Sequence, residues 1–441
     1  MRNGRYSSIL LFLLGAFSRT QVRIVGSMGV SEVVVFLVAP FIFFANYNQL
    51  KHDGFMPVIW LTFLTMVGCC VSSLCNGAYF ELFIRGFASP YAIFALIVVL
   101  HKLLRNNFGG LKWILLGLAV TLILSTFILQ PTTELDKYAS GRSGMEAVDG
   151  VMSSPIFWIG RIQPWVMLPV TGWYYQTPGI YAFFAAVAFA VFAMFTAESG
   201  RAAALVAFVT SVLLLVGGKR VHVLQKIKRK FWIIMLIMLV FLMVLFKAYK
   251  TAAVSGMLGE KARTKYEYQT KQGEDFLHLL IKGRTNFFAC MYEGIRKPII
   301  GYGPWAPDWD GVEGEFIFEY GTEEEVAVYE NNRRMGMVGW LGGHSQIGTF
   351  WVWYGVFGLL FWLYVIKELF FMFKNRMSVI PQWYGYFVVT IPSSVWAIFF
   401  SPFSGRVSES LLIVACLLVK AVHRGRVQLP YDMVREVAKN G

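Results

Sequence analysis

Two ionisable side chains stand out in the one long polar segment of this 441-residue chain, which spans about residues 250–345. Arg284 lies ahead of a turn-forming stretch at residues 298–303, and His344 lies where the chain re-enters an apolar run. An imidazole at this position can serve as a general base or as a hydrogen-bond donor near neutral pH. Alternatively, Arg284 is an interfacial arginine whose charged end reaches out to the membrane surface, and His344 has a structural role. Chemistry that needs water, charge and a proton acceptor has few other places in this chain.

A third candidate, Arg201, begins an apolar run directly after Glu198-Ser199-Gly200 and before three alanines. Small residues allow a neighbouring helix or a ligand to approach the backbone closely. The positive end of a helix dipole favours anions, so an arginine gains nothing from this position. Arg201 and the helix amides would together bind a phosphate group. A simple pairing of Arg201 with Glu198 explains the same residues, and the sequence leaves both interpretations open.

The sequence around Arg284 predicts an amphipathic helix that lies near the membrane surface. Apolar residues recur at helical spacing from Phe276 to Lys297, and basic side chains add positive charge to the same stretch. We expect the helix to end before Pro298, because the sequence Gly301-Tyr302-Gly303-Pro304 favours a turn.

Composition identifies the class of protein. Hydrophobic residues make up 56% of the chain and charged residues 15%, with a mean hydropathy of +0.56. A soluble protein is about a quarter charged. Apolar runs of about 20 residues recur here, and each is long enough to cross a hydrocarbon core of about 30 Å. A transmembrane barrel would alternate residue by residue instead. The sequence therefore predicts an all-α polytopic membrane protein.

Charge predicts the orientation of the spans. The net charge of +14 is better explained by basic cytoplasmic loops than by nucleic-acid binding, and the loop at residues 218–230 has six Lys or Arg and no acid. Counting from this loop gives about 12 transmembrane helices with both termini inside. Residues 250–345 become a large periplasmic loop within a single transmembrane domain, residues 1–441. The clear spans are residues 26–46, 56–75, 88–104, 112–130, 178–197, 201–217, 231–249, 346–366, 382–400 and 404–422, and the weaker ones are 6–17 and 156–176.

The expected periplasmic loop contains an acidic stretch. Between Trp305 and Asn332 there are nine Asp or Glu and no Lys or Arg. We expect most of these acids to be solvated. Asp308 and Asp310 have the D-x-D spacing that some glycosyltransferases use to bind a metal, but this spacing is frequent by chance. The five cysteines show no disulfide or metal-ligand spacing. We therefore expect neither a metal nor a cofactor.

The motifs around Arg201, Arg284 and His344, in their order along the chain, resemble those of the O-antigen ligase and O-antigen polymerase superfamily. Its members are polytopic glycosyltransferases of the GT-C type. The similarity covers residues 178–366 in detail and about twelve spans in outline. It rests on Ser199-Gly200-Arg201-Ala202, on Gly283-Arg284 with Pro298-Ile299-Ile300-Gly301-Tyr302-Gly303, and on His344-Ser345-Gln346 with Tyr354-Gly355-Val356-Phe357-Gly358. Ligases commonly have Asn where this chain has Ser345, and Gly200 separates Ser199 from Arg201. The choice between ligase and polymerase therefore stays open.

The resemblance implies a reaction on a glycan linked to undecaprenyl diphosphate at the periplasmic face of the bacterial inner membrane. By the family pattern, Arg201 and Arg284 would hold the diphosphate, and His344 would orient or deprotonate the acceptor hydroxyl. The acceptor would be lipid A–core for a ligase or another lipid-linked glycan for a polymerase. Flippases and chain-length regulators are the partners that such an enzyme implies. Further candidates for substrate binding are Arg161, Lys282, Tyr302 and Ser345.

Two other classes of function remain possible from the sequence. A flippase or another transporter of lipid-linked oligosaccharide would place charges in a central cavity and use broken helices at matching positions of inverted repeats. A non-catalytic scaffold for polysaccharide assembly would tolerate substitution of Arg284 and His344. The nearly uncharged interiors of the expected spans weaken the transporter hypothesis.

Overall fold

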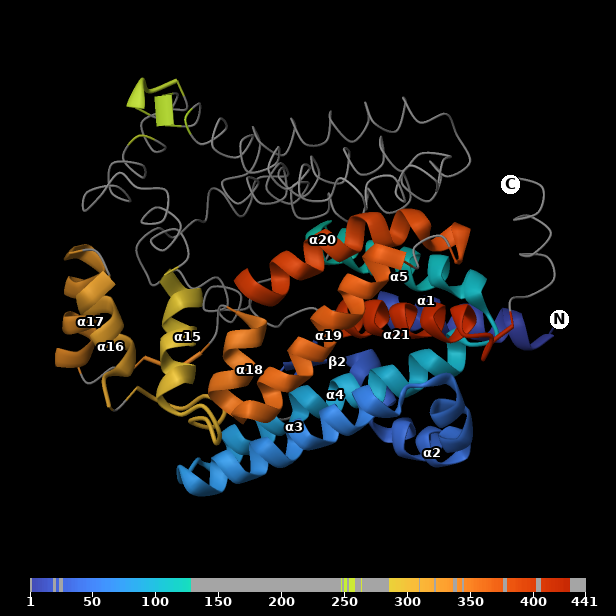
Figure 1. Cartoon of the computed structure of the whole chain (residues 1–441), viewed down its shortest axis with the longest axis horizontal. Helices are drawn as coiled ribbons and strands as arrows, with labels where there is room; N and C mark the ends of the chain where they lie inside the picture. The colour runs from blue at the N-terminus through green and yellow to red at the C-terminus, as the bar shows by residue number, and fades with distance from the viewer. Residues whose placement is uncertain are drawn as a thin grey trace.

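The chain folds as a bundle of α-helices with one two-stranded hairpin in the described part (Figure 1). The computed structural model describes residues 2–18, 21–23, 27–127, 247, 250–251, 254–257, 263, 285–308, 310–320, 323–335, 339–342, 345–375, 379–401 and 406–428. The first half contains α1 (Arg2–Ala16), β1 (Gln21–Arg23), β2 (Ser27–Gly29), α2 (Val30–Asp53), α3 (Met56–Cys75), α4 (Phe80–Leu104), η1 (Phe108–Gly110) and α5 (Leu111–Phe127). The second half contains α15 (Thr285–Arg296), α16 (Val312–Tyr320), α17 (Glu323–Arg334), α18 (Gln346–Tyr354), α19 (Val356–Asn375), η2 (Pro381–Trp383), α20 (Tyr384–Phe400) and α21 (Arg406–His423).

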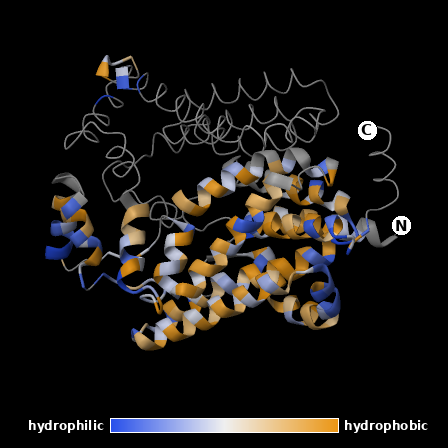
Figure 2. Ribbon diagram, in the orientation of Figure 1, coloured by the Kyte–Doolittle hydropathy of each residue, from blue (hydrophilic) through white to orange (hydrophobic). Residues whose placement is uncertain are grey.

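Several of the described helices are candidate membrane spans. Helices α2, α3 and α4, and the stretch Val356–Phe373 of α19, are each long and apolar enough to cross a bilayer. Hydrophobic residues dominate α2, α3 and α4, whereas α16 and α17 carry many hydrophilic ones (Figure 2). The protein is thus an all-α membrane protein with multiple candidate spans. The expected spans at residues 156–176, 178–197, 201–217 and 231–249 lie outside the described residues.

Contacts between helix ends agree with the alternating orientation that the charges predict. At one side, the buried Asp53 carboxylate at the end of α2 accepts a hydrogen bond of 2.6 Å from Arg105 Nε and lies 2.9 Å from His101 Nε2 near the end of α4. Trp383 Nε1, ahead of α20, donates to the Phe108 carbonyl ahead of α5 at that same side. The ends of α2 and α4 and the starts of α5 and α20 therefore lie at one side of the bundle, as the predicted alternation of span directions requires.

Helices α1 and α5 pack closely against each other because both have a glycine at the contact. A Cβ added at Gly15 would lie 2.4 Å from the Ile114 carbonyl oxygen, and one added at Gly117 would lie 2.2 Å from the Phe12 carbonyl oxygen. The two glycines therefore let the helix backbones touch, as small residues do at helix crossings in membranes. This contact explains why the weak apolar run at residues 6–17 has a well-defined neighbour.

The structure corrects three expected boundaries. The run expected as one span at residues 346–366 is two helices, α18 and α19, separated at Gly355, whose φ is 63°. Helix α2 begins at Val30 rather than residue 26, because residues 27–29 pair with residues 21–23 as an antiparallel hairpin. Helix α4 begins at Phe80, eight residues before the expected start, since hydropathy alone excludes the charged first two turns.

Candidate functional site

Two of the seven candidate site residues, Tyr302 and Ser345, belong to the described part of the structure. The other five, Arg161, Arg201, Lys282, Arg284 and His344, lie outside it. Two of these five nevertheless adjoin described helices in the chain: Arg284 directly precedes α15, and His344 directly precedes the residue that caps α18. The arrangement of α15 and α18 therefore positions the chain next to Arg284 and His344.

Helices α15 and α18 run side by side in the same direction. A Cβ added at Gly348 would lie 2.7 Å from Cys290 Cβ, and one added at Gly294 would lie 2.7 Å from the Trp351 ring. The contact partners on α18 therefore increase in residue number, from 348 to 351, as those on α15 increase from 290 to 294. The two helices are thus parallel. Glycines at both contacts allow the close approach.

The starts of α15 and α18 meet at the end of α20 (Figure 1). The Phe287 ring, in the first turn of α15, lies 6.0 Å from the Phe399 ring and 5.3 Å from the Phe400 ring. The Ser345 hydroxyl donates to the Ile398 carbonyl over 3.3 Å. The structure therefore brings together the helix that follows Arg284 and the helix that follows His344, with their first turns against one neighbour.

Ser345 defines the start of α18. Its Oγ accepts a hydrogen bond of 3.0 Å from the Gly348 amide, which is the usual arrangement of a serine that caps a helix. The side chain is fully buried. The contacts of Ser345 are thus those of a residue that fixes the helix start, and so the position of the chain immediately after His344.

The expected turn after α15 is confirmed. Helix α15 ends at Arg296, before Pro298, and the turn uses positive φ angles of 77° at Gly301 and 91° at Gly303. The Tyr302 amide donates to the Val352 carbonyl over 2.7 Å. The turn therefore packs its backbone directly on α18.

The same turn fills the break between α18 and α19. The Val356 amide donates to the Ile299 carbonyl over 3.1 Å, so the turn supplies a partner that a continuous helix would have supplied internally. A Cβ added at Gly355 would lie 2.0 Å from the Ile299 carbonyl oxygen. Only glycine fits both this contact and the positive φ. Two of the three sequence motifs, the turn after Arg284 and the segment after His344, are thus joined through their backbones.

Tyr302 lies within this junction. Its side chain is largely buried, and Lys297 Nζ lies 4.4 Å from the centre of its ring. Burial, together with the charge of Asp310, raises the pKa of Tyr302 to about 12. Tyr302 therefore offers a neutral phenol rather than a phenolate.

Asp308 acts as a helix cap in the acidic part of the segment. Its carboxylate accepts hydrogen bonds of 2.7 Å from the Val312 amide, 3.1 Å from the Glu313 amide and 3.2 Å from the Tyr329 hydroxyl. Asp308 is buried, whereas Asp310 is exposed. These contacts give Asp308 a structural role and separate the two acids of the D-x-D spacing.

Glu293 is a buried acid and Glu313 is a half-buried one, although the sequence predicted mostly solvated acids in the stretch between Trp305 and Asn332 that contains Glu313. Glu293, on α15, is 2% exposed, and its carboxylate accepts a hydrogen bond of 2.9 Å from the Gly342 amide. Burial raises the pKa of Glu293 well above its usual range, and the charge of Glu313 adds to the effect. Burial likewise raises the pKa of Glu313 to about 7, with a further contribution from Asp308.

The stretch at residues 339–342, two residues before His344, is held at three points. The Glu293 carboxylate binds the Gly342 amide, the Asp308 amide donates to the Gly339 carbonyl over 2.9 Å, and the Leu341 amide donates to the Ala306 carbonyl over 2.9 Å. Helix α15 and residues 306–308 therefore fix the path by which the chain approaches His344.

A group of charged and amide side chains lies at the starts of α2, α18 and α21, and we call it the helix-end cluster: Glu32, Gln346, Arg406 and Glu409. Arg406 Nη1 donates to Glu32 Oε2 over 3.1 Å, and Gln346 Nε2 donates to Glu409 Oε1. Gln346 belongs to the motif that begins at His344, whereas our sequence interpretation did not single out Glu32, Arg406 or Glu409. The signal for Arg406 and Glu409 was the one used for Arg201, namely an ionisable residue near the start of an expected span.

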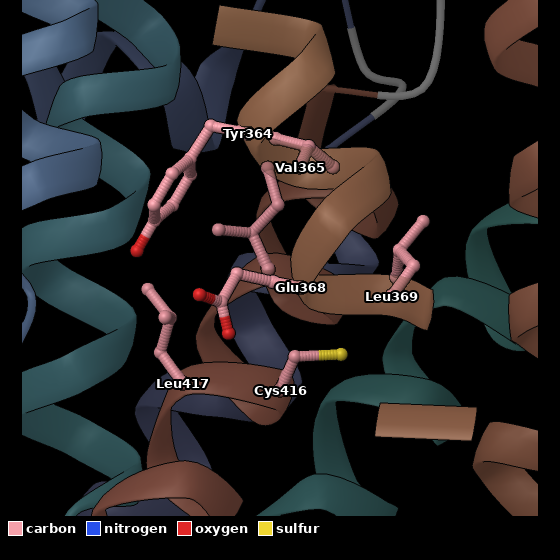
Figure 3. Close-up of a pocket in the computed structure, with 7 residues that line it drawn as sticks. Tyr364, Val365, Glu368, Leu369, Cys416 and Leu417 are labelled. Carbon is pink, nitrogen blue, oxygen red and sulfur yellow. The ribbon is translucent and has the colours of Figure 1, made fainter. Parts of the chain in front are cut away.

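The described part of the structure also contains a small cavity away from these residues, between α19 and α21. Its volume of about 10 Å³ has room for about one water molecule. Figure 3 shows the Glu368 side chain between those of Val365 and Cys416 in its wall. Glu368 forms an ion pair with Lys420. The cavity is too small for a glycan or a lipid diphosphate.

Comparisons with known proteins do not identify the family. No protein-family model, no curated protein and no solved structure matches this chain. The assignment of a function therefore depends on the residues and on the geometry described above.

Proposed function

We propose that this protein is a membrane glycosyltransferase that transfers or polymerises glycan from an undecaprenyl-diphosphate-linked donor at the periplasmic face of a bacterial inner membrane. The observation that carries the proposal is the parallel packing of α15 and α18, whose first turns meet beside the end of α20. In the chain, Arg284 and His344 directly precede these two helix starts. The proposal thus unites the cation and the proton acceptor in one site.

The proposed chemistry is a displacement at the anomeric carbon of the donor. A bond forms from the acceptor hydroxyl oxygen to the anomeric carbon, and the bond from that carbon to the diphosphate oxygen breaks. His344 takes the proton of the acceptor hydroxyl, and the electron pair leaves with undecaprenyl diphosphate. General base catalysis of this kind contributes about 10²–10⁴-fold to a rate.

Fixed positive charge would stabilise the departing diphosphate. Arg201 and Arg284 would each give paired hydrogen bonds, and each charge-assisted bond is worth about 1.5–3 kcal/mol. The arginines would supply the charge without a metal ion. Arg161, Lys282 and Tyr302 remain candidates for contacts with the rest of the donor.

The test is a transfer assay with the full-length protein purified in detergent and a lipid-linked repeat unit as the sole substrate. A ladder of longer lipid-linked products would identify a polymerase. Transfer only after addition of lipid A–core would identify a ligase. No transfer to either acceptor would contradict the proposal.

One observation favours a transporter as the second candidate function. The helix break at Gly355 resembles the discontinuous helices that transporters use to bind substrates. Here, however, the Ile299 carbonyl bonds to the Val356 amide at the break, so protein backbone occupies it. Translocation of a fluorescent lipid-linked oligosaccharide by proteoliposomes, without glycan transfer, would support the transporter instead.

A further inference from the structure

Two buried oxygen atoms in the helix-end cluster lack hydrogen-bond partners among the described residues: Gln346 Oε1 and Glu409 Oε2. Gln346 is 1% exposed, and it is the first residue of α18. Its amide nitrogen is already used, because Nε2 donates to the other carboxylate oxygen of Glu409. The two free oxygens therefore belong to side chains that are fixed to each other.

Other contacts make this pair rigid. Ser345 caps α18 and donates to the Ile398 carbonyl, which fixes the backbone next to Gln346. Arg406 lies one helical turn before Glu409 on α21, and it is engaged with Glu32 on α2. The pair is therefore held by contacts among α2, α18, α20 and α21, while one oxygen on each member has no partner among the described residues. Buried polar atoms are rarely left without partners, so such a pair requires an explanation.

The chemistry of the two atoms selects the class of ligand. Gln346 Oε1 needs a donor. Glu409 Oε2 needs a donor if the carboxyl is ionised and an acceptor if Oε2 carries the proton. A hydroxyl group both donates and accepts, so it satisfies Glu409 in either state. A metal cation is a poorer match, because Ca²⁺ takes six to eight oxygen ligands and Mg²⁺ takes six.

We infer that Gln346 and Glu409 bind hydroxyl groups of the acceptor glycan. The inference rests on the proposed function, and it adds an acceptor subsite to it. Gln346 is two residues from His344 in the chain, so an acceptor bound here would be close to the proposed base. The diphosphate-binding arginines act on the donor, and Gln346 and Glu409 act on the acceptor.

The test uses the full-length protein in detergent and compares single and double replacements. Gln346→Met and Glu409→Met each leave one polar partner buried, whereas the double variant removes both polar groups together. If the pair were only structural, the double variant would restore activity, because apolar groups of similar shape can replace a hydrogen-bonded pair almost without cost. We expect instead that its KM for the acceptor stays at least tenfold above wild type, while donor binding is unchanged.

The matched control is Ser410→Ala. Ser410 is also buried on α21, and its hydroxyl also lacks a partner among the described residues. We expect the control to have the acceptor KM of the wild type. An acceptor KM of the double variant within twofold of the wild type would overturn the inference.

A second measurement separates this inference from the proposed function. The infrared difference between the wild type and Glu409→Gln identifies the Glu409 carboxyl band, since the replacement keeps the shape of the side chain. The probe is the free oligosaccharide released by mild acid from the lipid-linked repeat unit. We expect the band to shift when this probe is added, whether or not transfer occurs. An unchanged band would overturn the inference even in an active enzyme.

Discussion

We expect Glu313→Gln to stabilise the acidic part of the long polar segment at pH 8 and to leave its stability nearly unchanged below pH 4.5. Glu313 is the second residue of α16, and its carboxylate interacts electrostatically with the buried carboxylates of Glu293 and Asp308. A Cβ added at Gly339 would lie 2.7 Å from Glu313 Oε2, so the carboxylate also faces the stretch that leads to His344. Gln keeps the size of the side chain and removes the charge.

The magnitude follows from the pKa. Burial raises the pKa of Glu313 from 4.5 to about 7. The folded state therefore binds the proton more tightly than the unfolded state, so stability is greatest below pH 4.5 and falls as the pH rises to about 7. At about 1.4 kcal/mol per pH unit between the two pKa values, the loss is roughly 3 kcal/mol. Glu293 changes in the same direction, because burial raises its pKa as well.

Hydrogen exchange with mass spectrometry, on peptides that cover residues 312–320 and 339–342, measures this stability at pH 5 and pH 8 after correction for intrinsic exchange. Between these pH values, we expect the protection factor of the wild type to fall by up to the amount that corresponds to this loss of stability. The protection factor of Glu313→Gln should fall much less. Glu319→Gln is the matched control, since Glu319 is exposed on the same helix. Identical pH dependence of the wild type and Glu313→Gln would refute the raised pKa of Glu313.

Three other changes have defined outcomes. Gly355→Ala should destabilise the protein by several kcal/mol, because its Cβ would lie 2.0 Å from the Ile299 carbonyl oxygen; thermal unfolding in detergent should show a lower Tm than Gly77→Ala, a site with positive φ and open space. His344→Ala should lower kcat by about 10²–10⁴-fold with little change in donor binding, and a rate near wild type would exclude its role as a base. Chelators should leave the transfer rate within about twofold of the rate without chelator, and strong inhibition would instead support a metal site at Asp308 and Asp310.

Features with a strong local signal were predictable from the sequence. The expected span at residues 56–75 is helix α3, Met56–Cys75, because a continuous apolar run has no competing signal. The end of α15 and the following turn were also predictable, since proline and glycine fix local backbone geometry. The break at Gly355 was not, because the glycine lies within an apolar run and its partner, Ile299, is distant in the sequence.

Contacts between distant segments limited the prediction of the site. Gln346 pairs with Glu409 and Arg406 pairs with Glu32, and no local pattern connects the members of either pair. Glu293 illustrates the same limit: an acid on a helical segment suggests solvent exposure, whereas its burial depends on packing against the stretch that contains Gly342. The chemical types of these residues were visible in the sequence, but their partners required the fold.

The release of undecaprenyl diphosphate from a lipid-linked repeat unit, measured with purified wild type, Arg284→Ala and Arg334→Ala, tests the central claim most directly. Arg334 is a basic residue of the same polar segment with a 79% exposed side chain, so its replacement controls for the loss of positive charge alone. We predict release by the wild type and by Arg334→Ala, and none by Arg284→Ala in a protein that remains folded in the detergent micelle. Equal release by all three proteins, or none by the wild type with either acceptor, would contradict the proposed site.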